Sequence, residues 1–207
     1  KHNSITLFNG QTRNLCDVYL TGENSEVTLN GCAIANGNQR IDNNTLIDHK
    51  VPNCQSNELY KYVVDGQSVG AFAGKILVEK DAQKTSSQET NANLCASKTA
   101  RMFTQPMLEI YADDVKCAHG STVGVMDEAA LFYMRQRGIA EDEARTLLKN
   151  AFMGQVIDQI TLVQHGDNGN PLHWYIGKTS CRDINDHQQY ICCADNIKRG
   201  INPLPAE

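Results

Sequence analysis

The residues PMLEIYADDVKCAHGSTVG, at positions 106–124, show the pattern from which the fold is predicted. Residues 107–111 form a short apolar run that is typical of a β-strand, and the turn-forming Asp113 and Asp114 follow it. Cys117 and His119 come next, two positions apart. In an extended backbone, residues with this spacing point to the same face of a sheet.

Cys117 and His119 are therefore a candidate metal site. A thiolate and an imidazole on one face, with Glu109 and the two aspartates close in sequence, are ligand types that suit iron or zinc. The spacing leaves a second interpretation open, in which Cys117 is a half-buried thiol and His119 a satisfied surface side chain. If the pair binds metal, we expect Cys117 to be easily deprotonated by its surroundings or by the metal.

Upstream of this stretch, short apolar runs alternate with clusters of Gly, Asn, Asp and Ser, and no helical periodicity intervenes. The runs predict strands near residues 18–20, 27–29, 45–47, 59–64, 75–78 and 93–96. Many short strands favour an all-β fold, and a sandwich, a barrel or a β-helix all fit the pattern. Asn91 and Asn93 are candidates for amides stacked inside the coils of a β-helix.

After Gly124 the spacing of apolar residues changes from two to about 3.6, which indicates helices. Asp127 is a candidate N-cap for a first helix that Gly138 ends. The acidic run EDE at 141–143 suits the start of a second helix with an apolar stripe. The two predicted helices form a hairpin that caps the last coil.

Composition excludes several classes of protein. The 207 residues are enough for one or two domains with a real core. The formal net charge of -5, with scattered Lys and Arg, argues against a nucleic-acid-binding face. The sequence has no apolar run of about 18 residues that would cross a membrane, and its eight dispersed cysteines favour a reducing compartment. We therefore expect a soluble, cytoplasmic protein without membrane or nucleic-acid partners.

The same stretch carries a resemblance to a known family. QPMLEIYADDVKCAHGSTVG and the following DEAALFYMRQRGI resemble the C-terminal signature of the SufB/SufD family of iron-sulfur cluster assembly proteins, and the SufD branch in particular. The runs NNTLIDHKVPNCQSNELYK at 43–61, GKILVEKDAQKT at 74–85 and QETNANL at 88–94 follow the SufD pattern in order. The resemblance is strong over residues 43–160 and looser over residues 5–40.

The resemblance implies a mainly β fold, a right-handed parallel β-helix followed by a C-terminal α-helical hairpin. On this basis we expect a β-helix core over residues 1–124, truncated at its N-terminus relative to the family. A helical subdomain follows over residues 125–160, and residues 161–207 form an unassigned tail in which the resemblance ends. Cys181, His187, Cys192 and Cys193 in this tail have the residue types of a zinc site without a standard spacing.

The resemblance also implies a function, that of a non-enzymatic scaffold subunit of the SUF system. Such a subunit pairs with a SufB-like protein through the last coils, near residues 107–111, and a homodimer can replace this pair. Cys117 and His119 match the positions of candidate iron or cluster ligands, with iron bound only transiently in the complex. The hairpin, with Asp127, Arg135 and Arg137 as candidate contacts, docks a SufC-like ATPase. The sequence contains no phosphate-binding G-x-x-x-x-G-K-[ST] loop of its own.

Two alternatives stay open at this point. The first is a carbohydrate-active β-helix enzyme, with Asp113 and Asp114 as paired carboxylates, although adjacent residues of a strand point to opposite faces. The second is a purely structural β-helix in which Cys117 and His119 bind nothing. The polar cluster in CQSNELYK, residues 54–61, is interpreted as a strand whose charged side chains, among them Glu58, are solvated.

Overall fold

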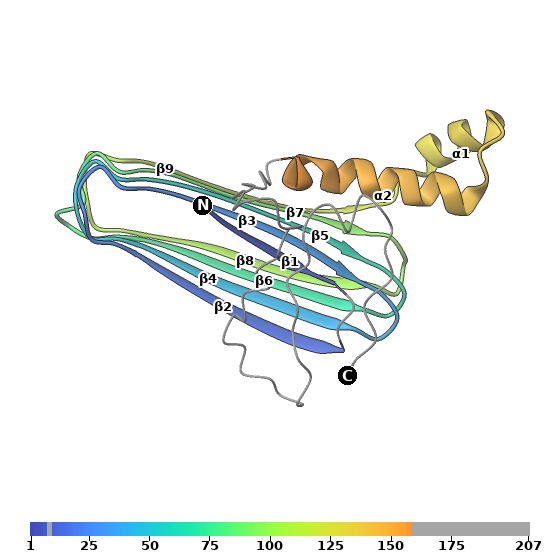
Figure 1. Cartoon of the computed structure of the whole chain (residues 1–207), viewed down its shortest axis with the longest axis horizontal. Helices are drawn as coiled ribbons and strands as arrows, with labels where there is room; N and C mark the ends of the chain where they lie inside the picture. Colours follow the sequence, from blue (N-terminus) through green and yellow to red (C-terminus); the bar gives the residue numbers. More distant parts are fainter. Residues whose placement is uncertain (8–9, 159–207) are drawn as a thin grey trace, which may run out of the picture.

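The computed structural model describes residues 1–7 and 10–158 of the chain. Figure 1 shows these residues as a stack of long strands with a helical hairpin on one side. The elements of the described residues are, in chain order, β1 His2–Thr6, β2 Gln11–Leu20, β3 Glu26–Ala35, β4 Arg40–His49, β5 Gln55–Val64, β6 Val69–Val78, β7 Ser86–Cys95, β8 Arg101–Ile110, β9 Lys116–Val125, α1 Glu128–Gln136 and α2 Glu141–Ile157.

The strands form two parallel sheets, and each strand pairs with the strand two places further along the chain. The five-stranded sheet has the order β1-β3-β5-β7-β9, and the four-stranded sheet has the order β2-β4-β6-β8. Gln11 pairs with Arg40 and Val69 pairs with Arg101, so one coil takes 29 (40 − 11) residues near the start and 32 (101 − 69) near the end. This is the parallel β-helix followed by two helices that the sequence and the family resemblance predicted.

Tight corners repeat from coil to coil and set this winding. Asn24, Asn53 and Lys84 occupy equivalent corners with φ of 61°, 60° and 58°. Asparagine tolerates this left-handed conformation because its short amide can hydrogen-bond locally. At the opposite corners, Gly37 and Gly66 take φ of 58° and 63°, where the lack of a Cβ removes the strain.

The interior of the coils holds the larger apolar core. Alternate residues of each strand point inward, and the inward residues of neighbouring strands stack in register. Tyr60 stacks over Gly31, whose missing side chain leaves room for the tyrosine ring, since a Cβ there would lie 2.1 Å from the ring. The Tyr60 and Phe72 ring centroids are 5.1 Å apart, and Tyr62 donates a hydrogen bond to the carbonyl of Ala71 at 2.8 Å.

Helix α2 of the hairpin packs on part of the outer face of the five-stranded sheet, over β3 and β5 (Figure 1). The prediction that the hairpin caps the last coil is therefore wrong. A second apolar cluster fills this junction, with Leu59 and Val63 of β5 against Met153 and Val156 of α2. The Lys61 ammonium donates a hydrogen bond of 2.9 Å to the carbonyl of Phe152, which links β5 to α2. Neither helix of the described residues has the length and apolar character needed to span a bilayer.

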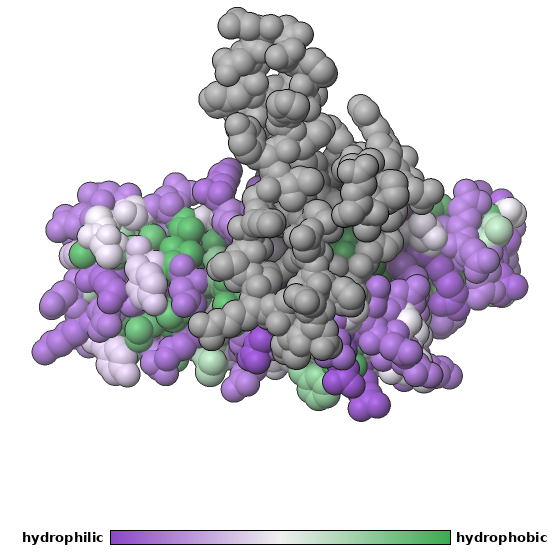
Figure 2. Space-filling view, turned by 60° about the horizontal axis from the view of Figure 1, so that its bottom comes forward, coloured by the Kyte–Doolittle hydropathy of each residue, from purple (hydrophilic) through white to green (hydrophobic). Residues whose placement is uncertain are grey.

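The outer face of the four-stranded sheet is more mixed. Leu15 on β2 is 67% exposed and Phe103 on β8 is 59% exposed. They share this face with charged residues such as Arg13, which pairs with Asp42 at 3.2 Å. Figure 2 shows hydrophobic surface lying among hydrophilic residues on this side of the molecule.

Candidate functional site

Cys117 and His119 lie on β9, the last strand of the five-stranded sheet, and they share one face as predicted. Their partners in the neighbouring strand β7 are Ser87 and Glu89. Because both partners are buried inside the coils, Cys117 and His119 line the interior at the final, open coil. In the extended strand β9, with the sequence KCAHGSTVGV, every second residue points to this side.

The Cys117 thiol is half-buried at the edge of a small apolar cluster. It packs with Leu108 and Val115 against Ile76, Val78, Ala82 and Ala112. Burial raises the pKa of the Cys117 thiol, and a hydrogen bond with the Ser87 backbone opposes the shift. The prediction that its surroundings ease deprotonation is therefore wrong, because desolvation penalises the thiolate. Metal coordination remains the route to a thiolate at this position.

The structure places two carboxyl groups behind His119 that the sequence had not assigned to the site. Glu58 of β5 and Glu89 of β7 are register partners, and Glu89 is in turn the partner of His119. Both are 0% exposed, and no oxygen of either carboxyl has a hydrogen-bond partner within the described residues. Leu29, Glu58, Glu89 and His119 thus form one inward-facing column across four strands.

Burial dominates the electrostatics of this column. Burial raises the pKa of the Glu58 carboxyl to about 7. The nearby Thr45 hydroxyl opposes this shift, although the hydroxyl and the carboxyl are not close and aligned enough to form a normal hydrogen bond. Burial, together with the charge of Glu58, raises the pKa of the Glu89 carboxyl to about 8. The column therefore holds protons at neutral pH that exposed glutamates would release.

The interpretation of Glu58 as a solvated side chain is wrong. Leu59 and Val63 on one face and Tyr60 and Tyr62 on the other are all buried, because α2 covers the outer face of β5. A strand buried on both faces loses the polar alternation that marks a solvated side. The only sequence signal for the burial of Glu58 was the period of two, which places Glu58 on the same face as the two tyrosines.

The other predicted metal-capable residues do not join the pair. Glu109 lies on the outer face of β8 and pairs with Lys75 at 2.9 Å. Asp113 and Asp114 are exposed in the turn before β9. Within residues 1–7 and 10–158, no three His, Cys, Asp or Glu side chains are placed to hold a metal ion together. Of the metal-capable side chains singled out in this part of the sequence, the described residues bring only Cys117 and His119 together on one face.

The predicted amides and the buried histidine are structural. Asn91 and Asn93 lie inside the coils, and the Asn93 amide donates to the Asn91 oxygen at 2.6 Å. His49 is fully buried, with its Nε2 2.9 Å from the Ser56 hydroxyl, which itself lies 2.6 Å from the Ser87 hydroxyl. Each of these side chains thus has at least one hydrogen-bond partner within the described residues, although the His49 Nδ1 and the Asn93 Oδ1 have none there.

The final coil exposes apolar side chains around the candidate metal site. Val123 and Val125 of β9, 51% and 79% exposed, point to the same open side as Cys117 and His119. Ile110 and Tyr111, at the end of β8, are also exposed. Strands β8 and β9 are the terminal strands of their sheets, so each has one edge without a strand partner in the described residues. An apolar rim on an open edge is typical of a protein interface.

The predicted partner-binding residues lie at the start and the tip of the hairpin. The Asp127 side chain accepts hydrogen bonds from the amides of Ala129 and Ala130 at 2.9 and 3.0 Å, which confirms it as the N-cap of α1. Arg135 and Arg137 are exposed. Arg135 pairs with Glu141 at 3.4 Å, whereas Arg137 bonds to a tyrosine of its own helix.

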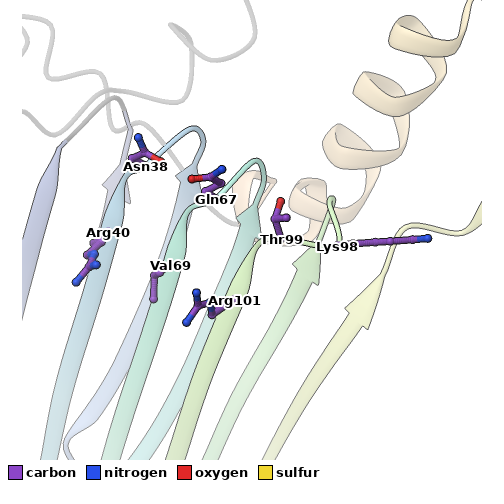
Figure 3. A pocket seen from close by; sticks show the side chains of 7 residues that line it. All are labelled: Asn38, Arg40, Gln67, Val69, Lys98, Thr99 and Arg101. Carbon is purple, nitrogen blue, oxygen red and sulfur yellow. The ribbon is translucent and has the colours of Figure 1, made fainter.

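A basic pocket of about 650 Å³ lies at the corners of the coils (Figure 3). Arg40 and Arg101, from β4 and β8, flank Val69 of β6 in register, and Lys98 lies on the adjacent corner. Figure 3 shows the Lys98 side chain pointing away from the other labelled residues. The lining is completed by Asn38, Gln67 and Thr99 and includes no acidic residue.

The candidate zinc ligands of the tail, Cys181, His187, Cys192 and Cys193, lie outside the described residues.

Comparison with known proteins matches this architecture to one family. The family model described as "SUF system FeS cluster assembly, SufBD core domain" matches residues 1–152. The chain is 38% identical over 157 residues to the iron-sulfur cluster assembly protein SufD of Escherichia coli, covering 76% of this chain and 37% of that protein. It is 42% identical over 126 residues to a SufBD family protein of Synechocystis, covering 61% and 28%. A SufBD family protein of Mycobacterium leprae is 34% identical over 172 residues, covering 79% and 44%. The chain thus spans less than half the length of these curated relatives.

Proposed function

Since the chain belongs to the SufB/SufD family of iron-sulfur cluster assembly proteins, we propose that it is a SufD-like scaffold subunit rather than an enzyme. In this role it pairs with a SufB-like protein at its last coil and binds an ATPase of the SufC type through its hairpin. Iron is the cargo of the complex and is held transiently by Cys117 and His119.

One observation carries this proposal: the open last coil combines two metal-capable side chains with an apolar rim. A thiolate and a neutral imidazole suit iron, and two ligands leave room for sulfide or for ligands from a partner. The exposed Val123 and Val125 lie further along β9 on the same side as the pair, and they provide apolar surface that favours burial against another protein. A site completed by a partner can release its cargo when the partners separate.

The pairing surface is tested by placing a charge on the open edge. We expect Val125→Lys to prevent association with a co-expressed SufB-like subunit, measured by size-exclusion chromatography with light scattering. Leu15→Lys is the matched control, because Leu15 is also exposed but lies on the outer face of the four-stranded sheet. Equal association of both variants with the partner would exclude the last coil as the interface. A homodimer of the isolated chain should respond to the same two substitutions in the same way.

The ATPase surface is tested on the hairpin. Arg135→Glu and Arg137→Glu should weaken binding of a SufC-like subunit without unfolding the chain, since both side chains are exposed. Arg101→Glu, on the exposed side of β8, changes charge by the same amount away from the hairpin and should leave the affinity unchanged. An affinity that no substitution on the exposed face of α1 and α2 alters would contradict the role of the hairpin.

The site itself is tested by anaerobic reconstitution of the assembled complex with iron and sulfide. Cys117→Ser should reduce the iron retained and the thiolate-to-iron absorption, and His119→Ala should reduce iron retention at least as strongly. Iron content that stays constant per folded complex in both variants would show that the pair is structural.

A further inference from the structure

Glu89 lies directly behind His119 in the stack of coils. The two residues are register partners on β7 and β9, and both project toward the interior. Neighbouring strands of a sheet are about 4.8 Å apart, and a glutamate and a histidine side chain reach similar distances from the backbone. The register therefore places the two side chains next to each other, and a contact between them requires the exposed His119 ring to turn toward β7.

The chain keeps this carboxyl in place at a cost to stability. Glu89 is 0% exposed and neither of its oxygens has a hydrogen-bond partner within the described residues, which is unfavourable for a buried polar group. Across the interior, Gly74 interrupts the apolar run of β6. A Cβ at position 74 would lie 2.2 Å from the Glu89 Oε1, so a larger residue there would displace the carboxyl from its present position.

A glycine within a strand and an unpaired buried carboxyl each reduce stability, and here the first accommodates the second. No contact within the described residues offsets the loss of stability that these two features cause. Two unfavourable features that occur together, here a glycine within a strand and an unpaired buried carboxyl, are typical of functional positions. The side chain next to Glu89 toward the open end is His119.

We propose that Glu89 is the positioning residue of the metal site, and this rests on the function proposed above. When one ring nitrogen of His119 binds a metal ion, the other carries an N–H that Glu89 accepts. A carboxylate or carbonyl partner of this kind fixes the tautomer and the orientation of a metal-bound histidine. One of the two Glu89 oxygens then gains a donor, the remaining N–H of the metal-bound His119 ring.

Glu58 provides a matched control within the same column. It is equally buried and its oxygens are equally without partners in the described residues, but Glu89 stands between it and His119. Glu58→Leu and Glu89→Leu therefore remove the same group from the same kind of environment. Any effect that arises from stability or from general loss of charge should appear in both variants.

The first measurement is a titration of the chain with Co²⁺ under anaerobic conditions, followed by thiolate-to-cobalt absorption. We expect Glu89→Leu to weaken Co²⁺ binding about 10- to 100-fold, as loss of a histidine-orienting partner does in other metal sites. Glu89→Gln, which keeps a neutral acceptor oxygen, should recover part of the affinity, and Glu58→Leu should leave it unchanged.

The second measurement needs no metal, because ¹⁵N NMR of the His119 ring reports its tautomer in the free chain. Glu89→Leu should change the ratio of the two tautomers and Glu58→Leu should not. Equal effects of the two Leu variants on Co²⁺ affinity and tautomer ratio, or no effect of either, would overturn the role of Glu89. If the wild-type absorption is also unaffected by Cys117→Ser and His119→Ala, the metal site itself fails. If the absorption depends on those two residues but not on Glu89, only this inference fails.

Discussion

The inward faces of β3 and β7 belong to one interior but carry opposite kinds of side chain. The inward residues of β3 are all apolar or glycine: Val27, Leu29, Gly31, Ala33 and Ala35. Their counterparts two strands later in the same sheet are Ser87, Glu89, Asn91, Asn93 and Cys95. The early coils therefore supply the apolar burial that holds the stack together. The last coils replace part of that apolar burial with polar side chains, of which Asn91 and Asn93 are hydrogen-bonded and the Glu89 carboxyl has no partner within the described residues. Apolar burial therefore decreases along the axis of the solenoid toward the candidate site.

The largest effect should come from shortening an apolar residue in the early part of the column. Leu29 is 0% exposed and lies between His2 of β1 and Glu58 of β5 in the column that ends at His119. We expect Leu29→Ala to lower the free energy of unfolding by about 3–5 kcal/mol, because it removes buried methyl groups and leaves a cavity. Urea unfolding followed by circular dichroism measures this loss. A loss below about 1 kcal/mol would remove the proposed difference between the two ends.

A somewhat smaller change in the free energy of unfolding should follow from a change of pH, because the Glu58 carboxyl titrates. Its folded-state pKa of about 7 lies above the ordinary value of 4.5, so the folded chain keeps a proton that the unfolded chain releases. The stability from this proton is complete below pH 4.5 and is lost as the pH rises from 4.5 through about 7. The difference is on the order of 3 kcal/mol.

Urea unfolding at a series of pH values measures this dependence. Glu58→Gln should flatten this part of the profile, since an amide does not titrate. An unchanged slope in the variant would mean that Glu58 does not retain its proton in the folded chain.

The hydrogen-bonded amides of the last coils should matter less than the apolar core. Asn91 accepts hydrogen bonds from Asn93 at 2.6 Å and from Thr104 at 2.8 Å, and donates to the Tyr60 carbonyl at 3.2 Å. We expect Asn91→Ala to cost about 2 kcal/mol, because buried partners lose their hydrogen bonds. Equilibrium unfolding at pH 6 tests this. A cost as large as that of Leu29→Ala would show that polar and apolar coils contribute equally.

The smallest effect should appear at the open end of the column. His119 is exposed and Cys117 is half-buried. His119→Ala and Cys117→Ser should each change the free energy of unfolding by no more than about 0.5 kcal/mol. Thermal unfolding in the absence of metal measures the change. Losses comparable to that of Leu29→Ala would make the pair part of the core and would contradict its assignment to binding.

The sequence predicted where the strands lie better than how long they are. The apolar runs mark positions within the strands of the solenoid, but β2 to β9 each extend over ten residues. β7, with the sequence SSQETNANLC, shows why the lengths were missed: its inward side is polar, so hydrophobic alternation vanishes although the strand is buried. Pattern alone left sandwich, barrel and β-helix open, and the family resemblance decided between them.

The candidate site, too, could be predicted from the sequence only in part. Cys117 and His119 could be predicted because two residues of metal-ligating type share a face at a spacing of two. Glu58 and Glu89 could not, because they are 31 residues apart (89 − 58) and meet only when successive coils stack. Their burial depends on that stacking and on Gly74, which lies in the other sheet. No local sequence pattern indicates contacts between residues that lie so far apart in the chain.

The position of α2 affects how the solenoid unfolds. In a simple solenoid each coil touches only its neighbours, so the terminal coils open first and independently. Here the helix that follows the last coil packs back on β3 and β5, and Lys149 of α2 forms an ion pair with Asp65 at the corner after β5. The last helix of the described residues thereby packs against coils that come much earlier in the sequence. Fraying of β9 is coupled through the hairpin to the middle of the stack, and the coils should melt as one cooperative unit rather than one at a time.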